Sequence, residues 1–151
     1  MSQDIEGWLS LAREVEHLFG PMAEAPGFRE ALGVAIEGQE AFTALLSSNG
    51  HDGSIVGGVV VSKSTNSIEW LVVSESARGL GIGQRLLDSA LDQLDPARPM
   101  AVQTFAPSSV EGLPARRLYL KAGFEDREPM GPNPAGVQTV LMVRPPRSRV
   151  L

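Results

Sequence analysis

Apolar residues follow two different spacings along this chain, and the change between them predicts alternating helices and strands. Over residues 5–19 and 28–36 apolar positions recur three or four residues apart, which is the spacing of one helical face. The pair Gly20-Pro21 ends the first predicted helix, and Gly38 ends the second. Later apolar runs are short and bounded by turn-forming residues, which is typical of strands. Strands are predicted over residues 41–46, 55–62, 68–73, 101–105, 124–130 and 138–143, with a loop over 131–136.

A glycine-rich turn follows the predicted strand at residues 68–73. Glycines stand at positions 79, 81 and 83, and an amphipathic helical pattern begins directly after them, with Leu86, Leu87, Ala90, Leu91 and Leu94 on one face. Glycine lets the backbone approach a ligand closely, and free N–H groups at the positive end of a helix bind phosphate. The sequence therefore predicts a site for a phosphate-bearing cofactor, and the alternative is a turn that only caps the helix.

The spacing of these glycines excludes two common phosphate-binding motifs. Counted from Gly79, the sixth position of a dinucleotide G-x-G-x-x-G motif is Gln84, and the P-loop string G-x-x-x-x-G-K-[ST] is absent. The string Arg78-x-x-Gly81-x-Gly83 instead resembles the acyl-CoA pyrophosphate motif of the GNAT superfamily of N-acetyltransferases. Residues 115–124, Ala-Arg-Arg-Leu-Tyr-Leu-Lys-Ala-Gly-Phe, resemble the second signature of that superfamily, A-x-x-L-Y-x-x-x-G-F. On these two motifs, in the family's order, the chain is identified as a member.

The resemblance implies an α/β (α+β) fold, with a mixed and mostly antiparallel central sheet flanked by helices. It also implies a splayed central pair of strands into which the pantetheine arm inserts. Family members usually begin with a strand, whereas the helical pattern here starts near residue 5, so that first strand is either absent or reduced. We expect one domain over 1–151, with a helical acceptor-side segment (1–40), a sheet and CoA-binding core (41–143) and a frayed tail (144–151).

Composition narrows the functional classes. The chain has 151 residues, the usual size of one domain, and no cysteine, which excludes disulfides, thiolate metal sites and a cysteine acyl-enzyme. His17 and His51 have no partner at metal-ligand spacing, so no metal is expected. The acidic start and the lack of a long apolar run predict a cytoplasmic protein without membrane contact. A net charge of −5 without basic–aromatic interleaving argues against nucleic-acid binding.

The resemblance places most of the acetyl-CoA site on the backbone. The main chain of residues 71–73 is expected to pair with the pantetheine amides like an added strand, and the N–H groups of 79–84 to hold the pyrophosphate. Gly112 occupies a position where relatives often carry an asparagine that touches the cofactor, so that contact is missing or supplied by Ser108 or Ser109. The predicted cofactor-binding residues are Leu71, Val72, Val73, Arg78, Gly79, Leu80, Gly81, Ile82, Gly83 and Gln84.

Basic side chains can add to this site. A guanidinium binds phosphate oxygens bidentately, so Arg78 is a candidate direct partner of the pyrophosphate. Further basic side chains can make the electrostatic potential at the site more positive or contact the 3′-phosphate. The alternative for each is a solvated role at the surface. These further cations are Arg85, Arg116, Arg117 and Lys121.

Acetyl transfer to an amine needs one group to take a proton and another to supply one. An aliphatic amine with a pKa near 10.4 is almost entirely protonated at neutral pH, and the departing thiolate must be stabilised. Tyr119, the only tyrosine, stands where the family motif places the residue that faces the thiol, and a protonated phenol can donate to it. The alternative is a core aromatic residue whose hydroxyl bonds to backbone.

Glu69 is the candidate base, at a position where many relatives carry a glutamate. Strand alternation predicts Glu69, Leu71 and Val73 on one face of their strand, with Trp70 and Val72 on the other. An exposed glutamate is a weak base at neutral pH, so the role needs partial burial or a relaying water. The alternative is a rim or salt-bridged glutamate, and Glu111 and Glu75 are further candidates for the base.

We therefore expect an N-acetyltransferase that moves the acetyl group of acetyl-CoA to the primary amine of a small molecule by direct attack in a ternary complex. The alternatives are acetylation of a protein or peptide, and a non-catalytic sensor of acyl-CoA. Residues 1–40 hold eight acidic residues but only two arginines. If those helices rim the acceptor pocket, they favour a cationic amine, and the alternative is that these charges are solvated. Homodimers are common among relatives, and no residue here demonstrates one.

Overall fold

Six strands form a single twisted sheet in the computed structural model, which describes residues 2–16, 27–46 and 54–147. The strand order is β1-β2-β3-β4-β6-β5, and every neighbouring pair is antiparallel except β3 and β4. This is the mixed, mostly antiparallel sheet that the sequence analysis predicted. The strands are β1 (Ala41–Leu46), β2 (Ser54–Ser62), β3 (Ser67–Val73), β4 (Met100–Phe105), β5 (Glu125–Pro132) and β6 (Gln138–Arg144).

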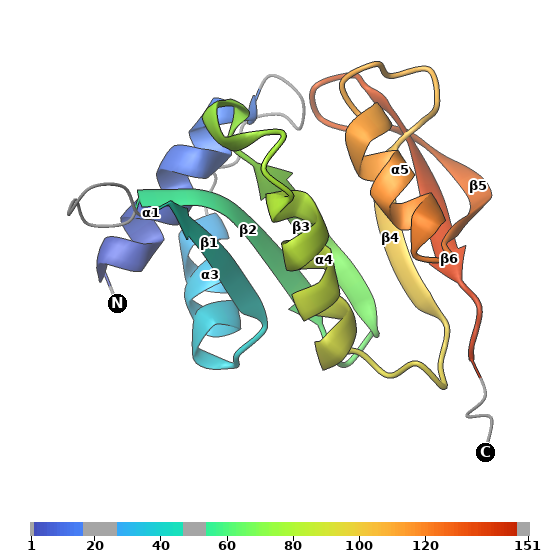
Figure 1. Cartoon of the computed structure of the whole chain (residues 1–151), viewed down its shortest axis with the longest axis horizontal. Coiled ribbons are helices and arrows are strands. Elements are labelled where there is room, and N and C mark those ends of the chain that lie inside the picture. Colours follow the sequence, from blue (N-terminus) through green and yellow to red (C-terminus); the bar gives the residue numbers. More distant parts are fainter. Residues whose placement is uncertain (1, 17–26, 47–53, 148–151) are drawn as a thin grey trace.

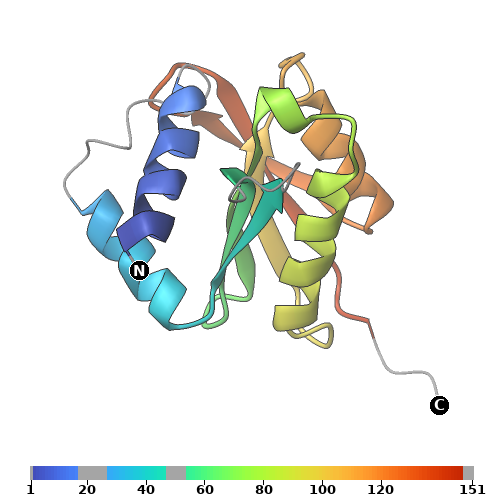
Figure 2. The same cartoon turned by 60° about the vertical axis from the view of Figure 1, so that its left-hand side comes forward.

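Helices cover both faces of this sheet. Figure 2 shows α1 (Ser2–Glu14) and α3 (Phe28–Glu37) on one side, with α4 (Ile82–Gln93) and α5 (Leu113–Lys121) on the other. The apolar face of α4 buries Leu86, Leu87 and Ala90 against the sheet, as its spacing predicts. A short 3-10 helix, η1 (Glu75–Ala77), connects β3 to the glycine-rich turn before α4. None of the described helices is long and apolar enough to cross a membrane.

The two parallel strands diverge at the centre of the sheet. Only two residue pairs, Ser67 with Ala101 and Ile68 with Val102, join β3 to β4. Beyond Ile68 the two strands separate toward their carboxyl ends, as Figure 1 shows. The β4-facing edge of residues 71–73 therefore lies outside the ladder of the described strands and is left for another hydrogen-bonding partner.

Two predicted features at the ends of the described chain need correction or completion. α1 is the first described element and no strand precedes it there, while residues 17–19 of the predicted helix lie outside the described part. The tail was predicted to be frayed, but Arg147 is anchored. Its backbone N–H donates to the Pro96 carbonyl at 2.7 Å, and its guanidinium donates to the Ala122 carbonyl at 3.1 Å, at the carboxyl end of α5. That part of the prediction is wrong up to residue 147.

Asn66 joins the turn between β2 and β3 to the loop that follows α4. Its side chain is 1% exposed, and its backbone has φ of 55°, in the left-handed region that asparagine tolerates. The amide donates to the carbonyls of Asp95 and Pro99, both at 3.0 Å, and its oxygen accepts from the Asp95 N–H at 2.7 Å. One side chain thus satisfies three backbone groups and fixes how α4 leads into β4.

Candidate functional site

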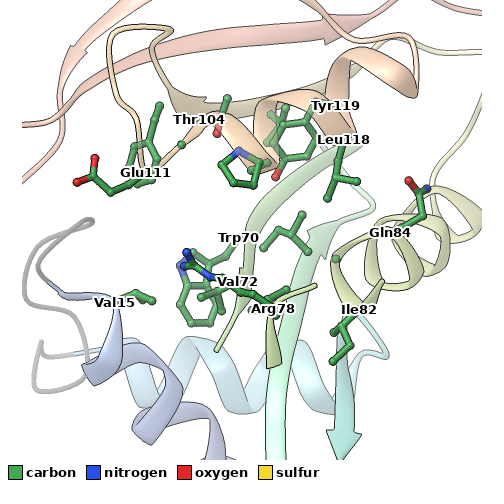
Figure 3. Close-up of a pocket in the computed structure, with 18 of the residues that line it drawn as sticks. Val15, Trp70, Val72, Arg78, Ile82, Gln84, Thr104, Glu111, Leu118 and Tyr119 are labelled. Carbon is green, nitrogen blue, oxygen red and sulfur yellow. The ribbon is translucent and has the colours of Figure 1, made fainter. Parts of the chain in front are cut away.

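A pocket of about 410 Å³ lies where β3 and β4 diverge. Figure 3 shows Ile82 and Gln84 on α4 at one end, Leu118 and Tyr119 on α5 along one side, and Val15 at the end of α1 on the far side. The pocket therefore crosses the sheet, from the face covered by α4 and α5 to the face covered by α1. The separation of the strands is what opens this route.

The glycine-rich turn is shaped by backbone conformation. Gly79 has φ of 83° and Gly81 has φ of 78°, both in the left-handed region, and Gly81 directly precedes the first residue of α4. The Arg85 N–H donates to the Gly81 carbonyl at 3.2 Å, so the N–H groups before it in the first turn have no acceptor within the helix. The turn therefore presents free N–H groups beside the pocket, which is the arrangement that binds phosphate.

Gly83 lies where α4 approaches α5. A Cβ there would lie 2.9 Å from the Cδ1 atom of Leu118, so that terminal methyl group would have to move to admit a side chain. The contact at Gly112, just before α5, is tighter, because a Cβ there would lie 2.5 Å from the Cβ atom of Phe105 in β4, which a side-chain rotation cannot move. An asparagine, which relatives often carry at that position, does not fit here without movement. Ser108 and Ser109 do not line the pocket.

We expect Gly81→Val to raise the Kd for acetyl-CoA at least about tenfold, because a β-branched residue in the left-handed region costs on the order of 1–2 kcal/mol or more and shifts the turn. Isothermal titration measures this directly. Gly136→Val is the matched control, since Gly136 has φ of 84° in the turn between β5 and β6, does not line the pocket and also has open space around its Cβ position. Equal loss of affinity in both variants contradicts a specific role for the turn.

Glu69 lies at an irregularity in β3 that the sequence did not reveal. Trp70 pairs with Val60 and Ile68 pairs with Val61, so Glu69 is an extra residue, or β-bulge, with no partner in β2. Ile68 packs in the same apolar cluster as Leu71, whereas Trp70 and Val72 pack toward α1. The predicted alternation is confirmed for Leu71 and Val73 on one face and for Trp70 and Val72 on the other. It does not extend through Glu69, because the bulge shifts the alternation by one position there.

The bulge leaves Glu69 exposed at the pocket wall. Its carboxylate accepts a hydrogen bond from the Ser67 hydroxyl at 3.0 Å. Glu111, from the loop before α5, is exposed and lines the pocket as well. Glu75 does not line the pocket.

Tyr119 belongs to the core and to the pocket at once. Its side chain is 3% exposed, and its ring meets Phe124 edge-on with centroids 5.7 Å apart. In Figure 3 its hydroxyl points toward the middle of the pocket. Burial disfavours the phenolate and raises the pKa of Tyr119 well above its usual range, so the hydroxyl keeps its proton at neutral pH. Tyr119 is thus a buried hydrogen-bond donor at the pocket wall.

Most of the predicted cofactor-binding residues lie at the pocket. Nine of the ten line the pocket, and Leu80 does not, because its side chain is exposed at the tip of the turn. Arg78 is one of these nine, whereas the basic candidates Arg85, Arg117 and Lys121 do not line the pocket. Sequence reasoning did not identify Val15, Trp70 and Phe105 as pocket residues, because only the sheet topology brings α1, β3 and β4 together.

Arg116, a candidate contact for the cofactor, serves the fold instead. Its side chain is 7% exposed, and its guanidinium donates two hydrogen bonds of 2.8 Å to the carboxylate of Asp126, joining α5 to β5. The pair lowers the pKa of Asp126 from its usual value, chiefly through these hydrogen bonds. The proposed phosphate contact by Arg116 is therefore wrong. Among the described residues, no group of three or more histidine, aspartate or glutamate side chains could hold a metal ion.

Sequence and structure comparisons agree with this geometry. A profile of the family described as "Acetyltransferase (GNAT) domain" matches residues 42–126, from β1 to the start of β5, which includes the glycine-rich turn and Tyr119. A search of curated proteins found no match.

Many solved structures share the fold at low sequence identity. A chain of the NatC complex, solved with a Gag peptide and CoA, has a TM-score of 0.71 and 17% identity over 98% of this chain and 93% of that one. Ard1 from Thermoplasma volcanium has a TM-score of 0.69 and 20% identity, over 95% and 92%. The ribosomal-protein-S18-alanine N-acetyltransferase from Escherichia coli has a TM-score of 0.64 and 15% identity, over 99% and 92%.

Proposed function

This chain belongs to the GNAT family of acetyltransferases, enzymes that transfer an acetyl group from CoA, and we propose that it acetylates the primary amine of a small cationic molecule. The observation that carries the proposal is the single pocket wall shared by the glycine-rich turn, the open edge of β3 and the hydroxyl-bearing Tyr119. Donors for a phosphate, for a pantetheine chain and for a thiolate thus lie along one path.

The residues present fit acetyl-CoA. The left-handed turn at Gly79 and Gly81 leaves open space where side chains would stand, so a pyrophosphate can approach the N–H groups at the start of α4. The unpaired edge of residues 71–73 can accept an extended chain as an added strand. When bound, acetyl-CoA supplies the activated acyl group as a thioester.

The chain's own groups provide the remaining steps. Tyr119 stays protonated and can donate its hydroxyl hydrogen to the sulfur as negative charge develops there. Glu69 is our candidate for receiving the proton of the attacking amine, through a water, because it is solvated at the pocket wall. The amine then attacks the acetyl carbonyl directly in a ternary complex, without a covalent enzyme intermediate.

Charge at the pocket supports a cationic acceptor, from a source other than the one the sequence suggested. Of the described residues in 1–40, only Val15 lines the pocket, so the acidic side chains of α1 and α3 do not form its wall. The carboxylates of Glu69 and Glu111 do line it, against one cation, Arg78. Trp70 adds an aromatic surface, and indole rings attract ammonium groups.

Release of free CoA thiol from acetyl-CoA, measured with pooled cationic, neutral and anionic small amines, tests the proposal. We expect release with the cationic pool, and Glu69→Gln together with Glu111→Gln should raise the acceptor KM at least about tenfold, since each lost charge pair is worth roughly 1 kcal/mol in a solvated pocket. Glu128→Gln, on the exposed strand β5, is the matched control and should leave KM unchanged. Release with anionic amines alone contradicts the charge argument.

Acetylation of a protein amino terminus is the second candidate. The three similar structures named above include one solved with a peptide and one named for the alanine of a ribosomal protein. Val110 beside the pocket residue Glu111 is 74% exposed and offers an apolar contact outside the pocket. A pool of short peptides with free amino termini separates the candidates, since release with this pool alone moves the assignment to a protein acceptor.

A further inference from the structure

The end of α1 is hydrogen-bonded to the segment that leads into the glycine-rich turn. The carboxylate of Glu14, the last residue of α1, uses both oxygens in this contact. Its Oε1 atom accepts from the Ser74 hydroxyl at 2.9 Å, and its Oε2 atom accepts from the Glu75 backbone N–H at 2.8 Å. The contact joins residues 60 and 61 positions apart in sequence, and neither motif of the family predicts it.

The segment that donates to Glu14, residues 74–75, is also held by other hydrogen bonds. Ser74 is buried, its N–H donates to the Val56 carbonyl of β2 at 2.7 Å, and its own carbonyl accepts from the Ala77 N–H at 3.0 Å. Ala77 lines the pocket and is directly followed by Arg78 and Gly79. Glu14 therefore holds the segment from which the glycine-rich turn departs, since its carboxylate accepts the backbone N–H of the first residue of η1.

The residue after Glu14 lines the same pocket from the opposite side. Val15 is buried and packs with Leu11 and Val72, and it is the only described residue before β1 in the pocket wall. Val15 directly follows Glu14, so the bonds from Ser74 and Glu75 to Glu14 form a continuous connection from the segment before the glycine-rich turn to Val15. The two sides of the pocket, the cofactor turn and the α1 wall, are thus joined by one pair of charge-assisted hydrogen bonds.

We propose that Glu14 is a positioning residue that couples acetyl-CoA binding at the glycine-rich turn to the order of the acceptor-side wall at the end of α1. This inference rests on the proposed function, because it takes the turn as the cofactor site. Binding that fixes the turn then also fixes Val15, so the cofactor prepares the pocket for the acceptor. By reciprocity, an acceptor held at that wall tightens acetyl-CoA binding by the same factor.

The experiment uses CoA alone as the probe and needs no catalysis. Kd for CoA is measured by titration, and hydrogen exchange is followed at residues 11–16 and 78–94 with and without CoA. In the unaltered protein we expect both segments to gain protection. In Glu14→Ala the Kd should rise at least about fivefold, and the gain at 11–16 should disappear while the gain at 78–94 persists.

Two further variants make the result specific. Ser74→Ala should reproduce part of the effect, and the double variant should be no worse than Glu14→Ala, because both changes break one link. Glu14→Gln keeps one acceptor oxygen and should fall between, and it decides the matter if Glu14→Ala fails to fold. Glu30→Ala, on the exposed face of α3, is the control and should match the unaltered protein.

A lowered melting temperature with unchanged Kd and unchanged protection at 11–16 means that Glu14 only stabilises the fold, and it overturns the proposal. Absence of CoA binding in the unaltered protein contradicts the proposed function itself. The two failures are therefore distinguishable.

Discussion

Tyr119→Phe should lower turnover at least about tenfold while the affinity for acetyl-CoA is retained, because the change removes only the hydroxyl that can donate to the departing sulfur. The ring of Tyr119 packs against Phe124 and belongs to the main apolar core, and phenylalanine preserves that packing. Single-turnover release of CoA thiol gives the chemical step, and isothermal titration gives the affinity. Equal turnover in the two proteins removes Tyr119 from the mechanism.

The pH dependence sharpens this result. Burial raises the pKa of Tyr119 well above its usual range, so the phenol remains protonated throughout an ordinary assay range. Rising pH therefore does not remove its proton, and the shape of the pH–rate profile should be the same in Tyr119→Phe as in the unaltered enzyme, only lower. An alkaline decline that disappears in the variant means that Tyr119 titrates within the range, contrary to its burial.

The second large effect concerns stability and lies outside the pocket. We expect Asn66→Ala to lower the free energy of unfolding by about 3 kcal/mol, since losing the hydrogen bonds of a buried side chain costs roughly 1–3 kcal/mol, and alanine also tolerates the left-handed region poorly. The backbone groups that lose a hydrogen bond are the Asp95 and Pro99 carbonyls and the Asp95 N–H. The Asp95 carbonyl keeps its bond from the Arg98 N–H, at 3.2 Å. Urea unfolding measures the change.

Asn133→Ala is the matched control, because Asn133 also holds a turn between strands, but a less buried one. Its side-chain oxygen accepts from the N–H groups of Ala135, at 2.9 Å, and Val137, at 3.1 Å. Water can replace these contacts more easily, so the loss should be about 1 kcal/mol or less. Similar losses at both positions contradict the argument that burial of Asn66 makes its hydrogen bonds valuable.

Most of the fold could be predicted because its elements carry local signals. The predicted strand over 41–46 is β1 with the same bounds, and the amphipathic helix predicted after the glycine-rich turn is α4, which begins at Ile82, one residue before the last of the three glycines. The errors occur where contacts distant in sequence decide the outcome. The bulge at Glu69 is defined by its register with β2, and the anchoring of Arg147 depends on Pro96 and Ala122, which no local pattern identifies.

The site divides in the same way. The backbone conformation at Gly79 and Gly81 can be predicted from the residue type, because few other residues adopt a positive φ without strain. The fate of a charged side chain is different. In the sequence Arg116 was a candidate phosphate contact like its neighbour Arg117, but in the structure it forms an ion pair with Asp126 on β5. A long flexible cation finds its partner in space, so only the folded chain distinguishes a cofactor contact from a structural ion pair.

The sequence by itself determined the family, the order of the elements and the position of the glycine-rich turn, because these depend on periodicity and on glycines that impose their own backbone conformation. The tertiary structure alone decided that α1 reaches the pocket through Val15, that Glu14 holds the segment before the turn, and that Glu69 and Glu111 give the pocket its charge. Each of these depends on which surfaces pack together. Packing joins residues far apart in the chain, and no short pattern encodes it.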